Sequence, residues 1–131
     1  MKVLALDYGS ARTGVAVSDP TGTVARPVEV IERAASRDGL ARIAELVREL
    51  EAELVVVGLP LTLRGERGLQ AAETDRFVVA LRAALDVPID LFDERFTTSL
   101  AAQYPSAAPE DARAAAHLLA GYLAWTGGRV G

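Results

Sequence analysis

The first third of the chain alternates short apolar runs with brief polar turns. The apolar runs cover residues 2–6, 13–18 and 24–31, and only a few polar residues or glycines separate one run from the next. Runs of this length joined by short turns are typical of neighbouring antiparallel strands. Pro27 lies within the third run. Because proline lacks a backbone N–H, we expect that strand at an edge of the sheet or at a bulge.

The rest of the chain alternates helical and strand patterns. Ser36 can cap a helix that carries an apolar stripe at helical spacing. The stripe consists of Leu40, Ile43, Ala44, Val47 and Leu50. A continuous apolar run at 54–57 indicates a strand buried on both faces. A second helix is predicted over 69–85, a fifth strand over 87–92, and a last helix from 109 or 110 to about 125.

This order of elements predicts one α/β domain. Three antiparallel strands come first, and the two later strands follow helical crossovers, so those two should lie parallel. The predicted architecture is a five-stranded mixed sheet flanked by helices, spanning residues 1–131 with a frayed tail over 126–131. A chain of 131 residues can build one core without disulfides or other staples.

Composition narrows the class of protein. Half of the residues are hydrophobic, which indicates a globular chain, and the chain contains no cysteine. The lack of cysteine excludes disulfides, thiol nucleophiles and cysteine-ligated zinc, and it fits a reducing compartment. Every apolar run is shorter than the ~20 residues of a membrane span, so we expect a cytoplasmic protein. The net charge of −4 disfavours tight non-specific binding to nucleic acid.

Acidic residues stand at the ends of three predicted elements. Asp7 closes the first strand, and Asp93 and Glu94 close the fifth. Asp111 lies in the first turn of the last helix, on the face expected to pack against the sheet. These carboxylates converge if the first and fifth strands end at the same sheet edge. Carboxylates bind Mg²⁺ or Mn²⁺, and one or two such ions would activate water against a phosphodiester.

Each carboxylate also has a simpler interpretation. Asp7 can cap the backbone of the turn at Gly9, Asp93 and Glu94 can form a solvated strand end, and Asp111 can complement the helix dipole. The D-x-G-x-x-x-x-G segment that begins at Asp7 also has the form of an ATP-phosphate turn in actin-like ATPases and sugar kinases. Those proteins enclose ATP between two such domains, and this length supplies one.

Arginines and hydroxyl groups accompany the acids in the sequence. Arg12 follows the first strand, and Arg95, Thr97 and Thr98 follow the fifth. Arg64 lies in a loop that contains two glycines. Because arginine and hydroxyl side chains bind phosphate well, these five residues are candidates for contact with substrate. The alternatives are solvated loops and, for the threonines, a helix cap.

Two further features have either an undecided role or an expected structural one. The tripeptide Gly58-Leu59-Pro60 either shapes the floor of the site or simply ends the fourth strand. His117 is the only histidine, and it lies beside the apolar stripe of the last helix, so we expect a structural role. Neither feature selects a function by itself.

Five motifs, in order along the chain, resemble the YqgF family. They are Leu6-Asp7-Tyr8-Gly9, Gly14-Val15-Ala16-Val17-Ser18-Asp19, Val56-Val57-Gly58-Leu59-Pro60, Asp93-Glu94-Arg95-Phe96-Thr97-Thr98, and Asp111 with the apolar residues that follow it up to Leu123. Members of that family are described as pre-16S rRNA nucleases or Holliday-junction-resolvase-like proteins. The resemblance implies a ribonuclease H-like fold, a divalent-metal nuclease site in a bacterial cytoplasm, and a role in maturing the 5′ end of 16S rRNA. It also implies that Asp7, Glu94 and Asp111 are the catalytic, metal-binding acids.

One segment departs from the family pattern. Only the residues from Ser99 to Glu110 separate Thr98 from Asp111, a shorter stretch than the family usually has, so Glu110 is the rival for the third acid. The resemblance leaves three functions open: a nuclease for structured RNA, a resolvase for four-way DNA junctions, and a non-catalytic factor that binds RNA or a ribosome-assembly protein. A monomer and a dimer are both compatible with the sequence.

Overall fold

The computed structural model describes residues 1–60, 64–65, 68–94 and 109–127, and its elements follow the predicted order. The elements are β1 (Val3–Asp7), β2 (Arg12–Ser18), β3 (Ala25–Glu32), α1 (Arg37–Glu49), β4 (Leu54–Leu59), α2 (Leu69–Ala84), β5 (Ile89–Asp93) and α3 (Glu110–Gly127). Their bounds lie within two residues of the predicted ones. The last helix extends to Gly127, two residues past its expected end.

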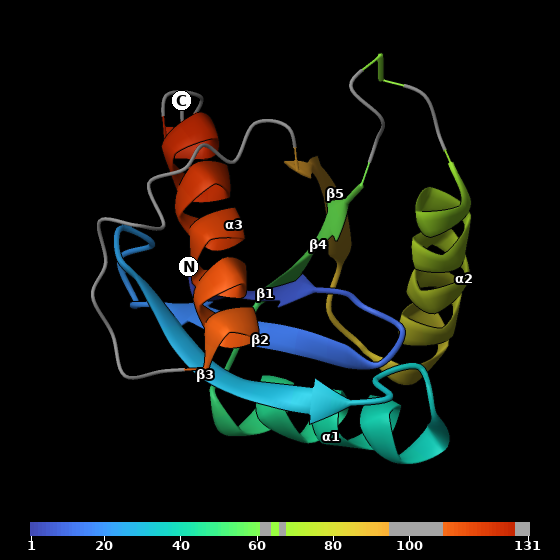
Figure 1. Ribbon diagram of the computed structural model, residues 1–131. Helices are drawn as coiled ribbons and strands as arrows, with labels where there is room; N and C mark the ends of the chain where they lie inside the picture. Colours follow the sequence, from blue (N-terminus) through green and yellow to red (C-terminus); the bar gives the residue numbers. More distant parts are fainter. Residues whose placement is uncertain (61–63, 66–67, 95–108, 128–131) are drawn as a thin grey trace.

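The five strands form one mixed sheet in the order β3-β2-β1-β4-β5. β1 pairs with β2, and β2 with β3, in antiparallel fashion, whereas β1, β4 and β5 run parallel. The predicted α/β fold with three antiparallel and two parallel strands is therefore confirmed (Figure 1). Because β1, β4 and β5 run the same way, their carboxyl ends lie on the same side of the sheet. These ends are Asp7, Leu59 and Asp93.

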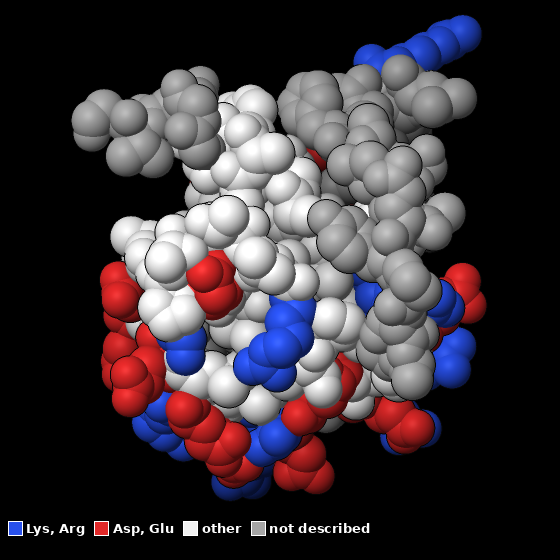
Figure 2. Space-filling view, turned by 90° about the vertical axis from the view of Figure 1, so that its left-hand side faces the viewer, with Lys and Arg blue, Asp and Glu red and all other residues white. Residues whose placement is uncertain are grey.

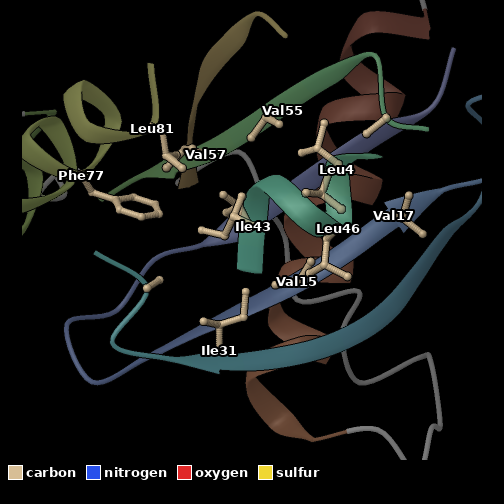
Figure 3. Close-up of a cluster of buried hydrophobic side chains, with 14 of the residues drawn as sticks. Leu4, Val15, Val17, Ile31, Ile43, Leu46, Val55, Val57, Phe77 and Leu81 are labelled. Carbon is tan, nitrogen blue, oxygen red and sulfur yellow. The ribbon is translucent and has the colours of Figure 1, made fainter. Parts of the chain in front are cut away.

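Side chains of the central strands alternate between two cores. Leu4 and Leu6 of β1 face the core that α1 and α2 cover (Figure 3). Val3 and Ala5 face the other core, which α3 covers on the opposite side of the sheet (Figure 1). Since side chains alternate along a strand, Asp7 points to the α3 side.

Local signals in the sequence explain where the first helix and the edge strand lie. The Ser36 hydroxyl accepts from the Gly39 amide at 3.1 Å and caps α1 as predicted. β3 is an edge strand, and its pairing with β2 shifts register between Val15 and Ala16, where Ala16 pairs with Pro27. Both parts of the expectation for Pro27 are thus confirmed.

Among the residues that the structure describes, no helix is long and apolar enough to cross a membrane.

Candidate active site

Asp7 and Glu94 meet on the α3 side of the sheet. Asp7 ends β1, and Glu94 follows β5 two residues after Phe92, which packs in the α3 core. The two carboxyl groups are joined by a hydrogen bond that lowers the pKa of Asp7 and raises the pKa of Glu94. A hydrogen bond between two carboxyl groups requires one proton, which Asp7 and Glu94 share. The convergence predicted from two strand ends is therefore present in this pair.

Burial is the main reason why both carboxyl groups resist ionisation. Burial, together with the hydrogen bond to Asp7 and the charges of Asp7 and Asp93, raises the pKa of Glu94 to about 7. Burial also raises the pKa of Asp7, and the charge of Asp111 adds to that rise. Two adjacent carboxylates ionise together only when a cation or other donor compensates them. The pair therefore offers the hard oxygen ligands that suit Mg²⁺ or Mn²⁺.

The turn after β1 is held by neighbours of Asp7. The Tyr8 ring stacks on Phe77 of α2 with 4.2 Å between ring centroids, on the side of the sheet opposite to Asp7. The buried Thr13 hydroxyl accepts from the Gly9 amide at 3.4 Å and donates to the Gly9 carbonyl at 3.3 Å. Thr13 thus caps the turn, and the Asp7 carboxylate is left to face Glu94.

Asp111 approaches the pair from the first turn of α3. Its carboxylate forms an ion pair with Arg12, with 3.3 Å between Arg12 Nε and Asp111 Oδ2. Its charge reaches Asp7, whose pKa it raises. Among the described residues, no three acidic, histidine or cysteine side chains already stand close enough together to hold a metal ion. Asp111 therefore lies near the pair but is turned toward Arg12.

A cleft of about 150 Å³ opens beside the two paired acids. Its lining residues are Asp7, Tyr8, Gly9, Ser10, Pro60, Gln70, Glu73, Thr74 and Glu94. The three residues from α2 were not expected from the sequence. Their spacing was the available signal, because Gln70, Glu73 and Thr74 stand at i, i+3 and i+4 and so share one face of a helix.

Among the described residues that line the cleft, neither Arg64 nor Glu110 is found. Arg64 is exposed in the segment before α2, and Glu110 is exposed at the start of α3. Arg95, Thr97 and Thr98 lie outside the described residues.

His117 is buried on α3, and burial lowers its pKa. A buried histidine on the helix that covers the sheet agrees with the structural role expected for it. No part of the cleft is formed by this residue.

Charges on one face of the molecule are mixed in sign. Figure 2 shows basic and acidic side chains interspersed, with no large area of described residues that is basic alone. The chain as a whole carries a net charge of −4. Contact with phosphate on this face would therefore depend on individual basic groups rather than on a broad positive surface.

Comparison with known proteins identifies the family. The family model RuvX, described as "Holliday junction resolvase", matches residues 1–124. The chain belongs to this RuvX/YqgF family. A protein of Chloroflexus aggregans named "Putative pre-16S rRNA nuclease" is 48% identical over 77% of this chain and 71% of its own length. A protein of the same name from Syntrophomonas wolfei is 36% identical over 100% of this chain and 98% of its own length.

Solved structures agree with the RuvX fold. A structure titled "T. thermophilus RuvC in complex with Holliday junction substrate" superposes with a TM-score of 0.69 at 18% identity, covering 98% of this chain and 96% of the other. A fowlpox virus Holliday junction resolvase has a TM-score of 0.55 at 10% identity, covering 95% of this chain and 99% of the other. At such low identity these structures support the ribonuclease H-like architecture alone.

Proposed function

We propose that this RuvX-family protein is a metal-dependent nuclease of the cytoplasm that hydrolyses phosphodiester bonds in structured RNA. The observation that carries the proposal is the half-buried, hydrogen-bonded pair of Asp7 and Glu94 beside an open cleft. Ionising both members of such a pair is costly without a compensating cation. Such a cost is typical of a site that is completed by a cation and its substrate.

Precursor 16S rRNA, processed at its 5′ end, is the proposed substrate. Support comes from the relatives in Chloroflexus and Syntrophomonas, which carry the name of a pre-16S rRNA nuclease. The Syntrophomonas relative is similar over nearly its whole length. The shared length supports a shared substrate class.

Asp7, Glu94 and Asp111 would hold the one or two metal ions. A bound Mg²⁺ or Mn²⁺ ion supplies a water of lowered pKa and a positive charge for the leaving oxygen. Glu94 must lose the proton that it shares with Asp7, and Asp111 must leave the ion pair with Arg12. Arg12 is then available for a phosphate oxygen of the substrate.

Cleavage of a precursor 16S rRNA fragment in Mg²⁺ or Mn²⁺ tests this proposal. We expect site-specific cleavage that EDTA stops, and a loss of at least about 100-fold in rate for Asp7→Asn and for Glu94→Gln. Asp90→Asn is a matched control, because Asp90 is an exposed acid on β5 away from the cleft. Cleavage that persists in Asp7→Asn and in EDTA would refute the metal-dependent mechanism.

A four-way DNA junction is the second candidate substrate. The description of the family model favours it, since that description names a Holliday junction resolvase. Precursor rRNA and junction DNA should be compared side by side at equal salt, because phosphate binding depends strongly on ionic strength. Faster cleavage of the junction would select the resolvase. Binding of rRNA without cleavage in either metal would instead indicate a non-catalytic assembly factor.

A further inference from the structure

Two glycines flank Asp7 in the sheet, one on each neighbouring strand. Gly14 of β2 is the registered partner of Asp7. Gly58 of β4 follows Val57, the partner of Leu6, so it lies level with Asp7 on the other side. The alternation of side chains puts all three residues on the α3 side of the sheet.

Each glycine leaves space that another acidic residue occupies. A Cβ atom at position 58 would lie 2.6 Å from Glu94 Oε1 and 3.0 Å from Glu94 Cγ. A Cβ atom at position 14 would lie 1.8 Å from the backbone oxygen of Asp111. These separations are shorter than the van der Waals contact distance. Any residue larger than glycine must therefore displace its neighbour.

Backbone conformation does not explain either glycine. Gly14 and Gly58 lie within the hydrogen-bonded registers of β2 and β4. Neither has a positive φ, unlike Gly22 and Gly65. A residue with a side chain can adopt the strand conformation at both positions. The feature that only glycine supplies there is therefore space above the sheet.

We infer that Gly58 and Gly14 are positioning residues, which seat Glu94 and Asp111 beside Asp7. β4 lies between β1 and β5, so the Glu94 side chain can reach Asp7 only by crossing over β4. Gly58 is the point at which it crosses. On the other side, Gly14 lets the first turn of α3 approach the sheet closely. The effect on metal binding rests on the proposed function, whereas the effect on side-chain position does not.

A crystal structure of Gly58→Ala tests the positioning directly. The nearest atom to the new methyl group is the carboxylate end of the Glu94 side chain, which can turn away without moving the backbone. We expect an unchanged sheet in which Glu94 no longer contacts Asp7. If Glu94 remains hydrogen-bonded to Asp7, the inference is wrong. Should Gly58→Ala not fold, the additional change Leu118→Val removes its other close contact, at 3.1 Å to Leu118 Cδ2, and keeps most of that buried side chain.

Titration with Mn²⁺ alone, followed by calorimetry, tests the consequence for metal binding. We expect Gly58→Ala to weaken binding about 10–100-fold, as for changes in residues that orient metal ligands. In a Glu94→Gln background the same substitution should have less than about a twofold effect, because the residue that it displaces is no longer a carboxylate. Equal weakening in both backgrounds would show that Gly58 does not act through Glu94.

Matched variants separate positioning from stability. Val56→Ala alters the same face of β4 two residues away and removes buried volume from the α3 core, so it should lower the melting temperature but leave Mn²⁺ affinity unchanged. Gly14→Ala should shift the start of α3 and weaken Mn²⁺ binding in the same way as Asp111→Asn. If the unaltered protein binds no Mn²⁺, the proposed function fails, and the crystal structure of Gly58→Ala still decides the positioning.

Discussion

Arg12 at the start of β2 holds Asp111 in the first turn of α3, with 3.3 Å between Nε and Oδ2. Asp111 is the third acid of the proposed metal site, and in this structure the Arg12 guanidinium is the cation that pairs with it. The pair is largely exposed, with 66% of the Arg12 side chain and 39% of the Asp111 side chain accessible. An ion pair this exposed is weak enough to be exchanged for a metal ion.

Arg12→Gln should therefore tighten binding of Mn²⁺ to the free protein. An exposed pair is worth about 0.2–1 kcal/mol, so we expect an increase in affinity of no more than about fivefold. The same variant should raise KM for RNA, because Arg12 is the proposed phosphate contact. Calorimetry and cleavage kinetics measure the two effects. Arg48→Gln, an exposed arginine on α1 that is not among the candidate substrate contacts, serves as the control. Weaker Mn²⁺ binding in Arg12→Gln would contradict the exchange of partners.

Stability of the metal-free protein should fall as the pH rises. Glu94 has a folded pKa of about 7 against an ordinary value of 4.5, so the folded state binds more protons than the unfolded state between these values. Stability then decreases with pH across this window and levels off above about pH 7. The raised pKa of Asp7 acts in the same direction. Thermal unfolding in EDTA should show this fall, and Glu94→Gln should show a smaller one.

Binding of Mn²⁺ should strengthen over the same range of pH. The proton that Glu94 shares with Asp7 must leave before both carboxylates can bind a cation. Release of one proton predicts a gain in affinity of about tenfold per pH unit below pH 7. A pH-independent affinity from about pH 5 to 8 would contradict the idea that this pair is the metal ligand.

Thr13→Val should destabilise the turn that follows Asp7. The change keeps the buried shape but removes the hydroxyl that bonds to both the amide and the carbonyl of Gly9. We expect a loss of about 1–2 kcal/mol in the free energy of unfolding, measured by urea denaturation. Thr13→Ser retains the hydroxyl and should recover part of that loss. Equal stability of Thr13→Val and the unaltered protein would show that Gly9 finds other partners.

Tyr122→Phe should weaken the attachment of α3 to β5 without affecting catalysis. The buried Tyr122 hydroxyl donates to Asp90 Oδ2 at 2.9 Å, and burial followed by this bond raises the pKa of Tyr122 to about 12. Asp90 is exposed and can bind water instead, so we expect a loss of about 1 kcal/mol. Urea denaturation measures the loss, and the rate of RNA cleavage in the same variant should stay within about twofold.

The sequence by itself determined the elements and their order, and its resemblance to the YqgF family selected Glu94 rather than Asp93 as the acid that accompanies Asp7. Helical spacing, strand alternation and caps such as Ser36 are local properties, so each segment reveals its own conformation. The same logic placed Asp7 at the end of one strand, and Asp93 and Glu94 at the end of another that was expected to end at the same side of the sheet. The expected position of Asp111 near these acids also agrees with its effect on Asp7.

Only the tertiary structure decided how these groups meet. The bond between Asp7 and Glu94 depends on β4 lying between their strands and on the space above Gly58. The partnership of Arg12 with Asp111, and the place of Glu73 in the cleft, likewise depend on how helices cross the sheet. Such contacts join residues that are distant in the chain, and local periodicity carries no information about which of them become neighbours.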